Sequence, residues 1–128
     1  MNAEQPAMEL PSPPDRGRTL LSVRNLRVRF GSKDVVHGVS FDLAAGEKLA
    51  LVGESGSGKT SLARAIAGLG ENVQGQLRYG GEPLAFTARQ RDARLRHQIQ
   101  YVFQNPYRAL NPRQTIAQTL SAPLTHFF

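Results

Sequence analysis

The stretch that decides the fold is Gly53-Glu54-Ser55-Gly56-Ser57-Gly58-Lys59-Thr60-Ser61, which fits the phosphate-binding pattern G-x-x-x-x-G-K-[ST]. The apolar run 48–52 (KLALV) precedes it and predicts a parallel β-strand that is buried on both faces. After it comes an apolar pattern at helical spacing, formed by Leu62, Ala63, Ile66, Ala67 and Leu69. A strand, a glycine-rich loop and a helix in this order predict a nucleotide site.

The residue types in this stretch suit a dense anion such as a triphosphate. Gly53, Gly56 and Gly58 let the backbone approach the phosphates without a clash at Cβ. Backbone N–H groups from about Ser55 to Ser61 can then converge on one point, with the positive end of the following helix behind them.

Two side chains of the loop complete the predicted site. Lys59 supplies a cation for the β- and γ-phosphates, and the Thr60 hydroxyl is placed to ligate Mg²⁺ that bridges the same oxygens. We therefore expect residues 53–61 to bind a nucleoside triphosphate together with Mg²⁺.

Composition narrows the class of protein. The chain has 128 residues, room for one domain at most, and no cysteine, which excludes a disulfide framework and a thiolate metal site. No apolar run reaches the length of a membrane span, and the N-terminus lacks the apolar region of a signal peptide. The net charge of +6 is spread along the sequence, so we expect no nucleic acid partner. The densest basic group is expected to be the solvated face of a helix: Arg89, Arg91, Arg94, Arg96 and His97.

The N-terminal part of the chain divides into a leader and a β-rich segment. Residues 1–18 are proline-rich and predict a disordered leader. Residues 19–47 predict antiparallel strands, with a bulge or break near Asn25, where apolar residues change from odd to even positions. The strand and helix of the phosphate-binding stretch occupy about residues 48–69, and Gly68-Leu69-Gly70 predicts the end of the helix.

Further elements follow that helix. Residues 74–79 predict a short strand closed by a hairpin-like turn, and Thr87 is a candidate N-cap for a helix over about 88–97. Residues 99–103 predict another apolar strand, which delivers Gln104 to a loop rich in turn-forming residues. Thr115 begins a last helical pattern.

This arrangement resembles the ATP-binding subunit of an ABC transporter, and in particular the peptide/nickel importer group. Residues 20–26 and 39–43 are similar to that family's opening antiparallel sheet, and residues 46–61 to its Walker A region. Val102-Phe103-Gln104-Asn105-Pro106, together with residues 110–113, resembles the family's Q-loop, here about residues 99–113. The likeness covers about residues 20–124.

The resemblance implies a fold and roles for two further residues. The fold is α/β, a P-loop NTPase core with an N-terminal antiparallel β-subdomain, incomplete and ending within the helical subdomain. Phe30 stands where the family has an aromatic side chain that stacks on adenine. Gln104 stands where the family has a glutamine that ligates Mg²⁺ and orients the attacking water, and the loop after it is where the family meets its membrane subunit.

The resemblance also implies partners and a location. These are transmembrane permease subunits, a second ATP-binding subunit, and a cytoplasmic position at the inner face of the cell membrane. The family's signature motif, Walker B strand and switch histidine lie beyond the Q-loop and are not in this sequence. We therefore interpret the chain as the N-terminal portion of an ABC-type ATPase and expect it to be inactive alone. The alternatives are another P-loop NTPase, such as a kinase or GTPase, and a non-catalytic regulatory fragment.

Overall fold

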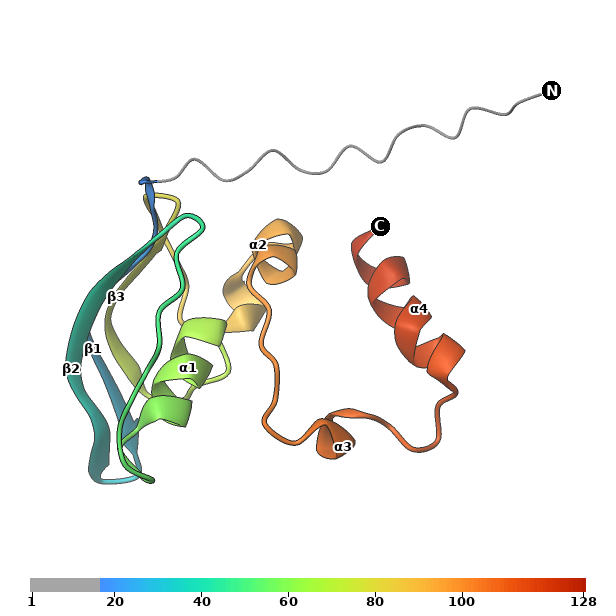
Figure 1. The fold of residues 1–128 in the computed structure, drawn as a ribbon, viewed down its shortest axis with the longest axis horizontal. Helices are drawn as coiled ribbons and strands as arrows, with labels where there is room; N and C mark the ends of the chain where they lie inside the picture. The colour runs from blue at the N-terminus through green and yellow to red at the C-terminus, as the bar shows by residue number, and fades with distance from the viewer. Residues whose placement is uncertain (1–16) are drawn as a thin grey trace.

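The computed structural model describes residues 17–128, so most of the predicted leader lies outside the described residues (Figure 1). A twisted antiparallel sheet and helix α1 (Lys59–Ala67) form one body, with α2 beside it and α3 and α4 farther away. The other elements are β1 (Thr19–Phe30), β2 (Lys33–Ala44), β3 (Val73–Tyr79), β4 (Glu82–Pro83), the 3₁₀ turn η1 (Ala88–Gln90), α2 (Ala93–Gln98), α3 (Pro106–Ala109) and α4 (Ile116–Phe127).

The sheet has the strand order β2-β1-β3-β4, and each neighbouring pair is antiparallel. This confirms the antiparallel N-terminal sheet. The change of apolar parity is a β-bulge within one strand, because the register of β1 shifts between Val23 and Leu26 and Asn25 has a φ of 47°. The extra residue turns both Val23 and Leu26 to the core side, where each is 0% exposed.

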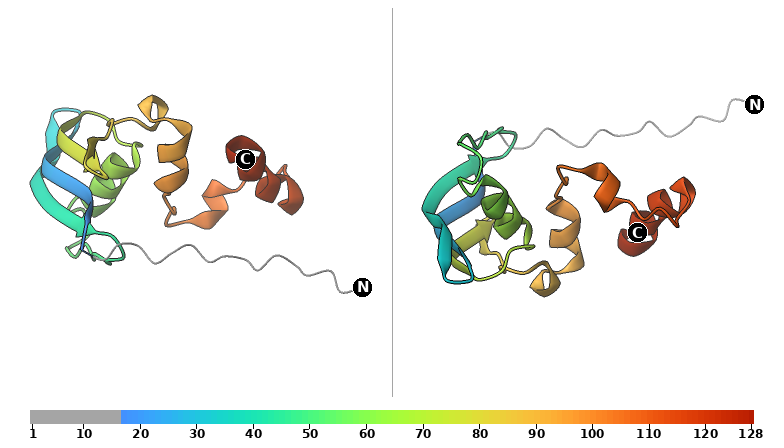
Figure 2. Two further views of the ribbon diagram at one scale, coloured as in Figure 1. Left: turned by 90° about the horizontal axis from the view of Figure 1, so that it is seen from above. Right: turned by 90° about the horizontal axis from the view of Figure 1, so that it is seen from below.

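Helix α1 covers the concave face of this sheet, as two further views show (Figure 2). Leu62 and Ala65 are buried against strand residues such as Val36 and Leu77. The helix ends where the sequence predicted, at Gly68, whose φ of 83° lets the Leu69 N–H reach the Arg64 carbonyl at 2.8 Å. Burial of this short helix therefore orients the loop that precedes it.

The strand predicted over residues 48–52 is wrong for this structure. The segment is extended but pairs with no strand among residues 17–128, and Leu49, Leu51 and Val52 are 47%, 41% and 92% exposed. A β-strand needs a neighbour to accept and donate its backbone hydrogen bonds. Apolar composition alone cannot supply that neighbour.

The strand predicted over residues 99–103 is wrong for the same reason. It also lacks a pairing partner in the described part of the chain, and Val102 is 91% exposed. Ile99 packs against the core, and the ring of Tyr101 meets that of Phe103 edge to face at 4.9 Å.

The helix predicted over 88–97 is divided in two. Thr87 precedes the 3₁₀ turn η1 but its side chain caps nothing, whereas the Asp92 side chain accepts the Leu95 N–H and begins α2. Aspartate is a strong N-cap, so it starts a new helix where a continuous one was expected. The expectation of a solvated basic face fails at Arg91, which is buried with 4% of its surface exposed.

Helix α4 begins where the sequence predicted. Thr115 accepts the Gln118 N–H at 3.2 Å, and the Gln118 side chain accepts the Thr115 N–H at 2.9 Å, which completes a capping box. The helix meets α2 through His97, whose ring centroid lies 5.3 Å from that of Phe127 and 5.2 Å from that of Phe128. It is not part of the core formed by the sheet and α1.

Candidate functional site

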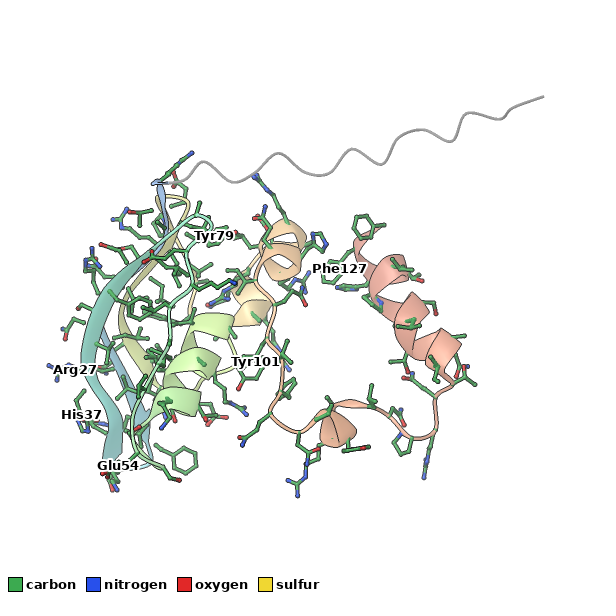
Figure 3. The ribbon with its side chains drawn as sticks, in the orientation of Figure 1. Arg27, His37, Glu54, Tyr79, Tyr101 and Phe127 are labelled. Carbon is green, nitrogen blue, oxygen red and sulfur yellow. The ribbon has the colours of Figure 1, made fainter. Side chains whose placement is uncertain are left out.

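The candidate site is the turn between the extended segment 48–52 and α1. Gly58 is the N-cap of α1 and has φ 92° and ψ 6°, a conformation that favours glycine. A Cβ atom on Gly58 would stand 2.4 Å from the Val35 carbonyl oxygen of β2, so the loop lies directly against the sheet. Figure 3 shows Glu54, the second residue of the loop, at the end of the molecule where α1 begins.

The N-terminus of α1 carries backbone donors that the protein leaves unused. The Ser57 N–H is bonded to the Glu54 carbonyl at 3.1 Å, and the Leu62 N–H to the Gly58 carbonyl at 2.8 Å. Between them, the N–H groups of residues 59–61 have no acceptor within the described residues 17–128. The first turn of α1 also contains no acidic residue. The positive end of the helix is therefore open to an anion from outside.

Lys59 bends back over the loop. Its ammonium donates to the carbonyls of Gly53 and Glu54, both at 2.6 Å, and to the Ser57 hydroxyl at 3.0 Å. All three of its donors are used, yet no carboxylate pairs with it in the part of the chain that the structure describes. The charge is therefore held at the loop and is not neutralised there.

The Thr60 hydroxyl is a candidate Mg²⁺ ligand. Thr60 is exposed and follows Lys59 on the first turn of α1. Residues 17–128 contain no cluster of three or more His, Asp or Glu side chains that could hold a metal. Mg²⁺ commonly keeps several waters and takes few protein ligands beside phosphate oxygens, so one hydroxyl beside free N–H groups fits such an ion together with a phosphate.

Phe30 lies close to this turn. It ends β1, is 77% exposed, and lines a hollow of about 370 Å³ that reaches Ser61 on α1. The other lining residues are Val28, Arg29, Val35, Arg64, Leu69, Gly70 and Glu71. The structure thus brings Phe30 and the last residue of the loop to one hollow with an aromatic wall.

The charge of Arg29 at this hollow is already paired. Its Nε donates to Asp34 Oδ1 at 2.9 Å across the β1–β2 hairpin. This hydrogen bond raises the pKa of Arg29 and lowers the pKa of Asp34. Arg64 is the other cation of the wall, and it has no acidic partner among residues 17–128.

Gln104 is not brought to the loop. It lies on the connection between α2 and α3, is exposed, and makes no hydrogen bond with a described residue. It also lines neither the Phe30 hollow nor a second hollow, of about 320 Å³, that Lys59 lines. The predicted residues thus form one group around the start of α1, with Gln104 apart from it.

Sequence reasoning missed two residues that shape the site. Gly58 packs against the Val35 carbonyl. Arg91 donates a hydrogen bond to the Ile66 carbonyl in the last turn of α1, at the end opposite the loop. The identity of an apolar strand residue does not indicate what its backbone carbonyl will contact. Arg91 cannot be told from the four other basic residues near it in the sequence. Only the packing distinguishes them.

The fold and this turn define the class of protein, a P-loop type α/β chain, and comparison with known proteins gives the family. The sequence profile described as ABC transporter matches residues 36–125, so the chain belongs to the ABC transporter family. The match does not favour the kinase, GTPase or regulatory alternatives.

The relatives named here are ATP-binding proteins of transport systems. The chain is 47% identical over 89 residues, 70% of its length, to "Di/tripeptide transport ATP-binding protein DppF" of Pseudomonas aeruginosa. It is 37% identical over 97% of its length to "Glutathione import ATP-binding protein GsiA" of Shigella dysenteriae, and 42% identical over 79% to a putative peptide import ATP-binding protein of Brucella ovis. The likeness to the peptide importer group is thereby confirmed.

The chain spans only part of these relatives, namely 28%, 22% and 33% of their lengths in the same order. A structure of a bacterial Atm1-family ABC exporter with ATP bound matches 61% of this chain and 14% of that chain, at 28% identity and a TM-score of 0.49.

Among the described residues, no helix has the length and apolar character needed to cross a membrane.

Proposed function

We propose that this chain supplies the ATP-binding part of an ABC importer subunit that couples ATP binding and hydrolysis to the uptake of peptides or similar small solutes. The observation that carries the proposal is the start of α1. Within residues 17–128, three N–H groups there have no acceptor, and the lysine beside them has no carboxylate partner. Two of the three relatives named above are peptide transporters by name and the third imports glutathione, which is itself a peptide.

The residues of the turn divide the work of holding a triphosphate. The free N–H groups of residues 59–61 donate hydrogen bonds to phosphate oxygens, and the positive end of the α1 dipole adds to the attraction for the phosphates. The Lys59 ammonium exchanges its bond to the Ser57 hydroxyl for phosphate oxygens and keeps its two backbone carbonyls. Mg²⁺, when bound, neutralises phosphate charge, and Thr60 is the residue of the turn that would hold it.

The nucleoside end is assigned to the hollow beside Phe30. Its aromatic ring is exposed and shares that hollow with Ser61, so a base can lie on the ring while the phosphates reach α1. Base–aromatic stacking contributes about 1–3 kcal/mol.

Gln104 is assigned to Mg²⁺ and to orienting the attacking water. Its side chain is exposed and free of hydrogen bonds with the described residues, so this role requires segment 99–105 to approach the turn. Hydrolysis also requires a general base, and no apolar run in this sequence ends in the Asp-Glu pair that supplies one in the family. We expect these 128 residues alone to bind ATP weakly and to hydrolyse none above background.

In the whole transporter, we assign as partners the transmembrane permease subunits and a second ATP-binding subunit. The place of action is the cytoplasmic, inner face of the cell membrane. The exposed apolar side chains of segment 99–103 and of α4, such as Val102 and Ile116, support a partner surface in this part of the chain.

The proposal is tested by titrating the chain with a fluorescent ATP analogue in the presence of Mg²⁺. Lys59→Ala removes one charge-assisted contact worth about 1.5–3 kcal/mol, so we expect affinity to fall by roughly ten- to a hundredfold. Lys48→Ala is the matched control, because Lys48 is an exposed lysine in the approach to the loop and makes no hydrogen bond with it. Its affinity should stay within about twofold of the unaltered chain.

Equal binding by the Lys59→Ala and unaltered chains, or no binding by a folded sample at millimolar analogue, contradicts the proposed site. ATP turnover by the 128-residue chain that Lys59→Ala abolishes contradicts the expectation that it is inactive alone.

A further inference from the structure

A buried arginine lies at the end of α1 opposite the P-loop. Arg91 is 4% exposed, although a charged side chain is rarely buried without a partner. Its guanidinium donates from Nε to the Ala85 carbonyl at 2.9 Å and from Nη2 to the Ile66 carbonyl at 2.8 Å. Arg91 therefore joins α1 to the segment that follows β4.

The two contacts of Arg91 are with backbone alone. No carboxylate pairs with it within residues 17–128, and burial lowers the pKa of Arg91 from its ordinary value. An arginine stays protonated in proteins, so the cation persists and its hydrogen bonds to carbonyls are charge-assisted. Ile66 lies in the last turn of α1, where a helix has its negative end and where a cation is favoured.

A second contact holds the same end of the helix. The Gly68 carbonyl accepts the Ala88 N–H at 2.9 Å, and a Cβ atom on Gly68 would stand 2.5 Å from the Ala88 nitrogen. By contrast, segment 48–52, which leads into α1, pairs with no strand in the described chain. The C-terminal end of α1 is thus the better anchored end.

We propose that Arg91 is a positioning residue, which fixes α1 through the Ile66 carbonyl and so sets the direction of the free N–H groups at Lys59, Thr60 and Ser61. Its relevance to ATP rests on the proposed function. A helix of nine residues is short and stiff, so an anchor in its last turn controls the orientation of its first. Arg91 also directly precedes Asp92, the N-cap of α2, and hence ties α2 to α1.

The test is hydrogen–deuterium exchange of the 128-residue chain at low micromolar concentration, followed peptide by peptide. Arg91→Met keeps a long side chain but leaves both carbonyls without their donor. We expect exchange in peptides covering residues 59–67 to quicken by about tenfold or more, with β1 and β2 within about twofold of the unaltered chain. Arg91→Lys keeps the charge with one ammonium in place of the fork, and we expect an intermediate increase.

Arg89→Ala is the matched control, because it removes an exposed arginine from the same turn. It should change neither α1 nor the sheet. The inference is overturned if Arg91→Met leaves α1 unchanged, or if exchange rises equally in β1, β2 and α1. Loss of protection throughout the chain in both Arg91 variants also overturns it, because Arg91 is then a residue of general stability.

A second arm separates this inference from the proposed function. ATP analogue and Mg²⁺ should slow exchange at residues 59–67 of the unaltered chain and do so less in Arg91→Met at the same concentration. If the Arg91 variants loosen α1 locally but the analogue protects no chain, the anchoring stands and the proposed ATP site fails. If the analogue protects the Arg91→Met chain as fully as the unaltered one, Arg91 has no positioning role.

Discussion

The body formed by the sheet and α1 buries apolar side chains in a core, and the part of the chain after residue 92 forms no such core of its own. Among residues 17–128, all eight buried hydrophobic residues precede residue 85, whereas α2, α3 and α4 contain no buried residue. Apolar side chains are nonetheless present in both, and Val102, Ile116 and Leu120 are exposed at 91%, 80% and 66%. Apolar sequence therefore makes a core only where another surface meets it.

Helices and strands also differ in where their backbone hydrogen-bond partners come from. Helix α4 forms with its capping box although no side chain in it is buried, because its hydrogen bonds are local. Segments 48–52 and 99–103 have strand-like sequences and form no strand, because a strand's hydrogen bonds must come from elsewhere in the fold.

The largest expected effect contrasts a buried and an exposed apolar residue. Leu26→Ala removes a side chain that is 0% exposed and should lower the free energy of unfolding by about 2–5 kcal/mol. Val52→Ala, at a residue 92% exposed, should change it by less than about 0.5 kcal/mol. Urea unfolding followed by circular dichroism measures both. A large loss in Val52→Ala would show that segment 48–52 is packed in solution, and the contrast between the two regions would fail.

An intermediate effect distinguishes two glycines of the P-loop. Gly58 and Gly56 both have positive φ, so alanine at either costs about 1–2 kcal/mol of backbone strain. Only at Gly58 does a new Cβ also meet the Val35 carbonyl, at 2.4 Å, whereas at Gly56 no atom lies within 4 Å. Gly58→Ala should therefore lower the melting temperature more than Gly56→Ala. Equal melting temperatures would mean that the loop does not lie against β2.

The smallest expected effect concerns an exposed ion pair on the sheet. Arg24 Nη2 donates to Asp42 Oδ2 at 2.6 Å, which lowers the pKa of Asp42. A carboxyl whose pKa is lowered by folding adds stability above its unfolded pKa, about 3.9, and this is lost as pH falls through the folded pKa. Asp42→Asn should slightly lower the melting temperature at pH 7.

The same difference should shrink in high salt and vanish below the depressed pKa of Asp42, where the native side chain is also neutral. Melting curves at pH 7 and at the lowest pH where the chain stays folded, each at two salt concentrations, measure it. A difference that persists at low pH would mean that the pair is not its cause.

Several features were predictable because their signals are local. The bulge near Asn25 followed from a change of apolar parity, the end of α1 from Gly68, and the start of α4 from Thr115. The grouping of residues 53–61 at the start of α1 followed from the motif itself. The predictions that failed are the strands over residues 48–52 and 99–103, because a strand needs a backbone partner that its own sequence cannot supply. The role of Gln104, which follows the second of these segments, stays a prediction.

The sequence by itself determined the family, the glycine-rich turn with its lysine, and the antiparallel strands around it. Each of these is encoded in residues close together in the chain, through backbone freedom, helix capping or apolar alternation. Only the tertiary structure decided that Arg91 is buried against Ile66, that Gly58 lies on Val35, and that residues 48–52 pair with no strand in the described part of the chain. Those outcomes depend on which surfaces meet in the fold. A contact between two residues far apart in the chain leaves no recognisable pattern in the local sequence around either residue.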